Sequence, residues 1–339
     1  MISNQVISNQ VNGSSTLLIT SSLITFGDAL RLSRDRLAGL TATPSLDAQV
    51  LLAHLAGRSR ASLLAHPEVH LSSHEFQQLE HALHRLASGF PLPYLLGQWE
   101  FYGRSFIITP DVLIPRPETE LLIETALGWI GKKTLSQRAQ SFRKERQEEI
   151  FIKSLRTSRE ISEKFLGGLC DEDFRIADIG TGSGIIAVTL AAELPAARLT
   201  ATDLSPAALA VARQNAARHG VVERLTFIQA DLFSDLQSSI FDLIVSNLPY
   251  IPTATLHGLP IFGREPTLAL DGGPDGLRLI ERLLAQAVGR LAPRGAMLLE
   301  IESSQGESAP QLARQYFPDA GISVLPDLAG HPRLLVIHI

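Results

Sequence analysis

Short apolar strands alternate with helical stretches from residue 174 onward, and this alternation limits the possible folds more than any other feature of the sequence. The strand candidates are 174–179, 198–203, 225–230, 241–246, 296–301, 322–325 and 333–339. Stretches with helical spacing separate several of them, notably 185–193, 205–218 and 276–290. Repeated strand–helix units predict a mainly parallel, doubly wound α/β sheet, which binds its ligand beyond the carboxyl ends of the strands.

The chain before residue 174 predicts a different organisation. Residues 25–92 repeat apolar positions at helical spacing, which predicts a small all-helical domain. Residues 93–117 alternate around turn signals and predict a β-hairpin that joins two domains. The larger domain then spans 118–339, and residues 1–24 are expected to form a polar, disordered leader.

A charged insertion at about 131–172 interrupts the larger domain. Within 131–165, ten Lys and Arg residues accompany five Glu, although the whole chain has a net charge of -5. The acidic balance argues against binding nucleic acid by bulk electrostatics, because such binding depends on clustered Lys and Arg. A solvated charged helix or a disordered insertion is the simpler interpretation of the segment. Weak contact with RNA or another acidic partner is the alternative.

The cysteine and histidine content argues against disulfides and metal sites. Cys170 is the only cysteine, so no intramolecular disulfide can form, which favours a reducing, cytoplasmic location. Six of the ten histidines lie within 54–84. Because they lack an HExxH pattern and a cysteine partner, we interpret them as parts of polar helix faces and expect no bound metal.

A glycine-rich loop, "DIGTGSG" at 178–184, follows the first predicted strand of the sheet. Glycines there let the backbone approach a ligand closely, and the start of the next helix offers unpaired N–H groups. Asp203 ends the second strand, 23 residues after Gly180, where it can accept hydrogen bonds from ribose hydroxyls. The pattern therefore predicts a cofactor that contains a nucleoside.

Two cofactors fit such a loop, a dinucleotide and S-adenosyl-L-methionine. Gly182, Gly184 and Ala187 satisfy the loose GxGxxG/A dinucleotide pattern, which is weak on its own. Asp178 favours S-adenosylmethionine, because a cationic sulfonium tolerates a nearby carboxylate and a pyrophosphate is repelled by it. Asn247 after the fourth strand favours it too. The residues expected to bind this cofactor are Asp178, Gly180, Thr181, Gly182, Ser183, Gly184, Asp203, Leu204, Asp231, Leu232 and Asn247.

The motifs taken in order resemble a known family. The series "DIGTGSG", "TDLS", "ADLF" and "SNLPY" resembles a class I, seven-stranded methyltransferase of the Asn-x-Pro-Tyr kind. With "LIPRPETELLIE" and "REPTLALDGGPDGL", the chain resembles the bacterial release-factor glutamine N5-methyltransferases, the PrmC/HemK family, from about Leu46 to Ile339 except for the insertion. The resemblance implies a closing hairpin of the last two strands. It also implies methyl transfer to the glutamine of the Gly-Gly-Gln motif in class 1 peptide chain release factors. No apolar run reaches the ~18 residues of a membrane span, so we expect no membrane segment, and we expect a monomer.

The Asn-x-Pro-Tyr segment suggests how an amide nitrogen could be methylated. This nitrogen is a poor nucleophile, because its lone pair is delocalised into the carbonyl. The Asn247 oxygen and the Leu248 carbonyl would each accept one of its hydrogens, with Tyr250 against the amide face. Pro249 restricts Leu248 to extended conformations. The resemblance thus assigns catalysis to Asn247, Pro249 and Tyr250, and substrate binding to Asn247, Leu248, Pro249, Tyr250, Arg116 and Glu118.

Leu248 departs from the glutamine-methylating pattern, which has proline at this position. "NLPY" resembles instead the motif of ribosomal RNA adenine dimethylases, so an adenine N6-methyltransferase acting on RNA is the alternative enzyme. A methyltransferase of a ribosomal protein and a non-catalytic binding protein that retains the fold are further alternatives. If Leu248 simply replaces the family proline in a turn, Leu248→Pro should be tolerated.

Overall fold

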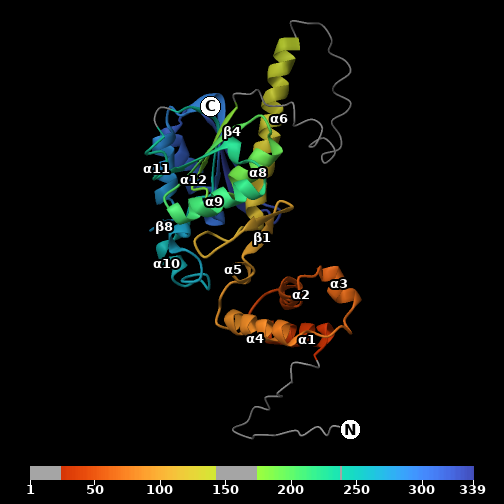
Figure 1. Ribbon diagram of the computed structural model, residues 1–339. Coiled ribbons are helices and arrows are strands. Elements are labelled where there is room, and N and C mark those ends of the chain that lie inside the picture. The colour runs from red at the N-terminus through yellow and green to blue at the C-terminus, as the bar shows by residue number, and fades with distance from the viewer. Residues whose placement is uncertain (1–23, 143–173, 237–238) are drawn as a thin grey trace, which may run out of the picture. The chain divides into compact units, whose positions relative to one another are not determined.

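A computed structural model describes residues 24–142, 174–236 and 239–339, which form two compact units divided between Leu96 and Gly97 (Figure 1). The predicted leader lies outside the described residues apart from its last position, and so does the charged insertion from 143 to its end. The first part of that insertion, 131–142, continues a helix of the larger unit.

The described part of the smaller unit, residues 24–96, contains five helices. They are α1 (Phe26–Leu37), α2 (Pro44–Leu55), α3 (Arg60–Ala65), α4 (Ser73–Ala87) and α5 (Leu92–Leu96). A capping box starts α4, because the Ser72 hydroxyl accepts from the Glu75 N–H and the Glu75 carboxylate accepts from the Ser72 N–H. The apolar faces meet in a core of Phe26, Leu51, Leu52, Leu63, Leu79 and Leu83, all buried.

The hairpin is shorter than predicted and belongs to the larger unit. It comprises β1 (Gln98–Phe101) and β2 (Arg104–Ile107), joined at Tyr102 and Gly103. Both turn residues have positive φ, 51° and 67°, which matches the right-handed twist of a two-residue hairpin. The preceding residues form α5 instead of a strand. The buried Asn215 docks the hairpin, because it accepts from the Ile107 N–H at 2.7 Å and donates to the Ile107 carbonyl at 3.0 Å.

A seven-stranded sheet organises the larger unit, which confirms the predicted class I methyltransferase fold. Its strands are β3 (Arg175–Ile179), β4 (Arg198–Asp203), β5 (Leu225–Gln229), β6 (Phe241–Ser246), β9 (Leu291–Glu300), β10 (Gly321–Pro326) and β11 (Pro332–His338). The order is β10-β11-β9-β6-β3-β4-β5. Within this sheet β11 alone runs opposite to the other six strands, and it pairs with β10 in the closing hairpin. The fifth predicted strand begins earlier than expected, at Leu291.

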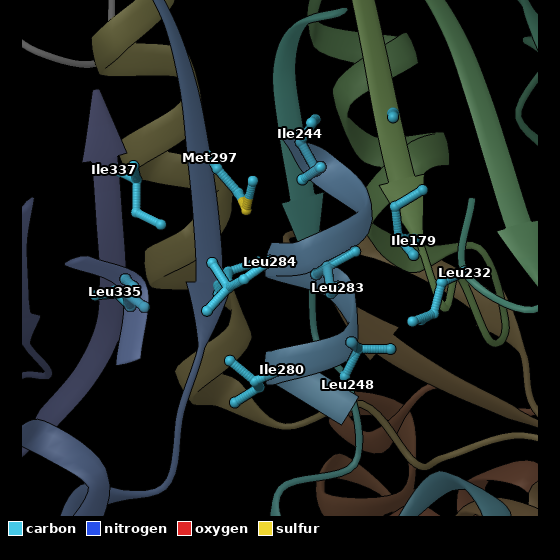
Figure 2. Packing of buried hydrophobic residues seen from close by; sticks show 14 of the residues in the cluster. Ile179, Leu232, Ile244, Leu248, Ile280, Leu283, Leu284, Met297, Leu335 and Ile337 are labelled. Carbon is cyan, nitrogen blue, oxygen red and sulfur yellow. The ribbon is translucent and has the colours of Figure 1, made fainter. Parts of the chain in front are cut away.

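Helices cover both faces of this sheet (Figure 1). One face carries α6 (Glu120–Phe142), α8 (Ile185–Glu193) and α9 (Pro206–Arg218), and the other carries α11 (Arg278–Ala287) and α12 (Ser308–Tyr316). Figure 2 shows Leu283 and Leu284 of α11 packed over Ile244 and Met297 of the sheet. Among the described helices, none combines the length and the apolar character that a bilayer crossing requires.

Short elements outside the sheet complete the larger unit. They are η1 (Pro117–Thr119), η4 (Val222–Arg224), β7 (Ile251–Pro252), α10 (Thr253–Leu256), η5 (Thr267–Ala269), β8 (Asp271–Gly273) and η6 (Ser303–Gly306). Strand β7 pairs in parallel with β8 just after the Asn-Leu-Pro-Tyr segment. After β3 the chain crosses to β4 on one side, and after β6 it crosses to β9 on the other side. A crevice is therefore expected between the carboxyl ends of β3 and β6.

Removal of a core side chain on α11 tests this packing. Leu283 is fully buried, so we expect Leu283→Ala to lower the free energy of unfolding by about 2–5 kcal/mol through lost burial and a cavity. Leu328→Ala is the matched control, because Leu328 is fully exposed in the same unit. Denaturant unfolding followed by circular dichroism measures both. Equal losses for the two variants would contradict the assigned core.

Candidate active site

A cleft of about 700 Å³ opens at the carboxyl ends of β3, β4 and β6. It brings together most of the residues predicted from the sequence. The predicted residues that line it are Arg116, Gly180, Thr181, Gly182, Ser183, Asp203, Leu204, Asp231, Leu232, Asn247, Leu248 and Pro249. Four others, Asp178, Gly184, Glu118 and Tyr250, lie outside its lining.

The glycine loop forms the floor of the cleft. Gly180, Gly182 and Gly184 have φ values of 75°, 56° and 80°, a region that side chains disfavour. A Cβ on Gly180 would lie 2.8 Å from Cδ2 of Leu248, and one on Gly184 would lie 3.0 Å from Cβ of Ala212. Gly184 therefore serves the packing of α8 against α9, whereas Gly180 and Gly182 face the cleft.

Asp178 lies behind the loop and holds it in place. Its Oδ2 accepts from the Thr181 hydroxyl at 2.6 Å and from the Ala187 N–H at 3.1 Å. Burial raises the pKa of this carboxyl to about 7, although both hydrogen bonds oppose the rise. The sequence pattern suggested a carboxylate beside the cofactor, but the side chain supports the loop from the far side.

Asp203 at the end of β4 faces the cleft. Its Oδ1 accepts from the Ser205 N–H and its Oδ2 accepts from the Gly182 N–H, both at 2.8 Å. Burial raises the pKa of Asp203, and these backbone donors lower it. Each carboxylate oxygen can accept a second hydrogen bond, so the side chain can still receive the hydroxyls of a ribose. The half-exposed Leu204 beside it offers an apolar surface.

The segment after β5 forms another wall. Asp231 pairs with Arg282 of α11 at 2.8 Å. Leu232 is buried at φ 59°, a left-handed conformation that is uncommon for a non-glycine residue. Strained backbone of this kind often occurs at ligand sites. Sequence patterns gave no sign of Arg282, which reaches the cleft from a distant helix.

The Asn-Leu-Pro-Tyr segment supplies the wall next to the glycine loop. Nδ2 of Asn247 donates to the hydroxyl of Thr119 at 3.1 Å. The Leu248 side chain is buried, and Figure 2 shows it among Leu232, Ile280 and Leu283. The Leu248 side chain is thus part of the core. Leucine in place of the family proline therefore adds core packing as well as changing the turn.

Tyr250 lies behind the wall of the cleft. Its hydroxyl donates to Oε1 of Glu300 at 3.0 Å, and its carbonyl accepts from Nε2 of Gln305 at 3.1 Å. Gly276 packs against the same carbonyl, and a Cβ there would lie only 2.1 Å from that oxygen. Gly272 and Gly276 of "DGGPDGL" therefore support this segment from behind. The predicted contact of the ring with a substrate amide stays a prediction.

A loop across the cleft carries the "PRPETE" motif. Arg116 pairs with Glu265, a carboxylate whose side chain is 3% exposed and which also accepts from the Ile114 N–H at 3.1 Å. Arg116 thus orders the loop, one of the two roles that the sequence suggested. Glu265 was overlooked, although it lies within the "REPTLALDGGPDGL" stretch. Thr119 was overlooked in the same way within "PRPETE".

Comparison with known proteins identifies relatives over most of the chain. Residues 28–97 match a family model described as the PrmC N-terminal domain, and 161–257 match one described as a methyltransferase small domain. A release factor glutamine methyltransferase of Moorella thermoacetica is 41% identical, covering 89% of this chain and 93% of the relative. One of Bordetella pertussis is 40% identical, covering 86% and 93%.

A solved structure resembles part of the chain more distantly. It is the N-terminal domain of human METTL16 in complex with SAH, with 17% identity, a TM-score of 0.42, and coverage of 70% of this chain and 76% of that one.

The pKa of Asp178 gives a pH test of the glycine loop. A carboxyl whose pKa is raised on folding stabilises the fold while protonated, and this contribution is lost as the pH rises from about 4 to about 7. Asp178→Asn cannot ionise. We therefore expect the variant to gain stability relative to the wild type between about pH 4 and about pH 7, measured by denaturant unfolding. A difference independent of pH would contradict the buried, raised carboxyl.

The burial of Leu248 changes what Leu248→Pro should do. Proline cannot fill the space against Gly180 and Ile280, so we expect the free energy of unfolding to fall by about 1–4 kcal/mol, measured in denaturant. Leu248→Met is the matched control, because it conserves volume and should cost less than about 1.5 kcal/mol. A proline variant as stable as the wild type would support the expectation from sequence that Leu248 simply replaces a proline in a turn.

Proposed function

Since the chain belongs to the release factor glutamine methyltransferase family, we propose that it methylates the side-chain N5 of the glutamine in the Gly-Gly-Gln motif of class 1 release factors. The enzyme uses S-adenosylmethionine as its cofactor, which supplies an electrophilic methyl group. The choice of glutamine over adenine rests on the relatives that are 41% and 40% identical. The observation that carries the chemistry is the position of Asn247, Leu248 and Pro249 in the same cleft as the glycine loop. A planar amide and the cofactor would therefore meet in one place.

The residues of the cleft fit this cofactor. Gly182 leaves room for close approach of a ligand to the backbone, because a Cβ there would face open space, and Gly180 lets Leu248 pack against the loop. Asp203 keeps free acceptor sites for ribose hydroxyls, and Leu204 gives an apolar contact for a base. Asp178 contributes indirectly, by holding the loop through Thr181.

Asn247 and Leu248 would act on the substrate amide. Their oxygens can accept the two hydrogens of the amide nitrogen, which fixes its direction and opposes conjugation with its own carbonyl. The same acceptors stabilise the positive charge that develops on nitrogen as its bond to carbon forms. The nitrogen then releases a proton to water, because the alkylated amide is strongly acidic. No dedicated general base is needed.

We further propose that the helical unit, Phe26–Leu96, recognises the release factor. Its support is the match of 28–97 to the PrmC N-terminal domain family. A cytoplasmic location follows from the proposed substrate. A monomeric state and a weak RNA contact through 131–165 stay predictions, and most of that segment lies outside the described residues.

Labelled S-adenosylmethionine tests the proposal directly. The enzyme is incubated separately with a class 1 release factor, ribosomal proteins and RNA, and transfer of the labelled methyl group is followed. We expect label in the release factor, and none when its Gly-Gly-Gln glutamine is replaced. Label in RNA but none in the release factor would favour adenine methylation.

The role of Asn247 has its own test. Asn247→Ala removes an acceptor needed as nitrogen becomes positive, so kcat should fall by about 100- to 1000-fold. Affinity for S-adenosylmethionine, measured by calorimetry, should stay within about twofold, because the glycine loop and Asp203 are unchanged. Undiminished turnover would remove Asn247 from the mechanism.

A further inference from the structure

Helix α11 and the turn after it hold the chain that follows β5 through three polar side chains. Arg282, Gln286 and Arg290 follow one another at intervals of four residues, which places the first two on one face of the helix. Their partners are, in the same order, an Asp231 oxygen, the Phe233 N–H and the Leu236 carbonyl. Segment 231–236 is therefore attached to this part of the chain along its length.

Segment 231–236 forms the part of the cleft next to Asp203. Asp231 and Leu232 line the cleft, and the Ala230 N–H donates to the Asp203 carbonyl at 3.1 Å. Leu232 has a left-handed φ of 59°, which costs a leucine free energy and persists only where neighbouring contacts enforce it. The shape of this wall therefore depends on what holds the backbone at Leu232.

The contact at Asp231 is too exposed to hold this backbone. The Asp231 and Arg282 side chains are 46% and 44% exposed, and exposed ion pairs contribute little to stability. The contact at Phe233, the residue after Leu232, is different. Oε1 of Gln286 accepts from the Phe233 N–H at 3.0 Å, and Phe233 is fully buried. Without Gln286 this N–H would lose its partner away from water, which is unfavourable.

Arg290 contacts the side chain of the same phenylalanine. Its guanidinium lies 5.0 Å from the centroid of the Phe233 ring, a favourable cation–π arrangement. Nε of Arg290 also donates to the Gln286 carbonyl at 3.0 Å. Phe233 is thus held by its ring through Arg290 and by its backbone through Gln286.

We propose that Gln286 is a positioning residue for the cofactor, which holds the Leu232 backbone in the conformation that S-adenosylmethionine meets in the cleft. Gln286 itself lies outside the lining of the cleft, so it acts through Phe233 and Leu232 and not by direct contact. The proposal rests on the function proposed above only in placing the cofactor in this cleft, whatever the methylated substrate is.

Loss of the hydrogen bond from Phe233 to Gln286 should weaken cofactor binding without changing the chemistry. Without the Gln286 oxygen, the backbone at Leu232 can relax out of its left-handed conformation, and only a fraction of the molecules then has the binding-competent wall. The apparent Kd rises by the inverse of that fraction. A saturating cofactor concentration returns the segment to its bound conformation, so kcat stays the same.

Gln286→Leu tests the proposal, because leucine favours a helix and lacks the side-chain acceptor. Calorimetry should show the Kd of S-adenosylmethionine raised by about 5- to 30-fold, the range expected for one buried hydrogen bond. The kcat at saturating cofactor should stay within about twofold of the wild type. Gln286→Glu keeps an acceptor oxygen on a side chain of the same length and should return the Kd to within about threefold. Gln311→Leu, at an exposed position of α12, is the matched control and should leave the Kd unchanged.

Gln286→Met provides a second variant, should Gln286→Leu fold poorly, since methionine keeps the length of the side chain without the oxygen. A wild-type Kd in the Leu and Met variants, while Asp203→Ala weakens binding, would overturn the positioning role and leave the cofactor placement intact. Equal weakening in the Leu and Glu variants would assign a packing role to Gln286 and also overturn the proposal. A wild-type Kd for Asp203→Ala would reject the cofactor placement of the proposed function, and this proposal with it.

Discussion

The contact between Leu248 and the backbone of Gly180 sets the relation between the two halves of the cleft. The space there is so small that a Cβ on Gly180 would lie 2.8 Å from the leucine side chain. Both residues follow parallel strands in direct register, Ile179 opposite Ser246. The loop that would hold the cofactor and the segment that would hold the substrate are therefore packed against each other. Their separation is fixed by core packing, which deforms little.

Buried or largely buried carboxylates give the walls of the cleft their shape. Asp178 holds the glycine loop, Asp203 joins that loop to the end of β4, and Glu265 anchors the segment around Arg116. Glu300 accepts from the Tyr250 hydroxyl behind the Asn-Leu-Pro-Tyr segment. Burying such groups is unfavourable unless hydrogen bonds compensate, and each of them accepts from backbone or side-chain donors. These buried polar residues thus determine the positions of the protein groups that can form hydrogen bonds with a ligand.

The sequence predicted the fold and the location of the cleft, but it could not predict which way side chains point. Strand–helix alternation placed the sheet correctly, because periodicity follows directly from burial. A motif indicates that a residue lies near a site, but it does not indicate which way the side chain points. Asp178 and Tyr250 were expected to contact ligands, and both lie outside the lining of the cleft. Leu248 looked like a turn residue, because its core contacts come from helices far along the chain. Thr119 and Glu265 were missed, because their contacts with Asn247 and Arg116 span sequence separations that local patterns do not cover.

In the proposed mechanism, the Asn247 oxygen and the Leu248 carbonyl together accept the two hydrogens of one amide nitrogen. A crystal structure of the enzyme with S-adenosylhomocysteine and a release-factor fragment containing the Gly-Gly-Gln motif would measure this directly. We expect the glutamine nitrogen within hydrogen-bond distance of both oxygens, with Nδ2 of Asn247 still bound to Thr119. A glutamine nitrogen facing Nδ2, or a glutamine bound outside the cleft, would contradict it.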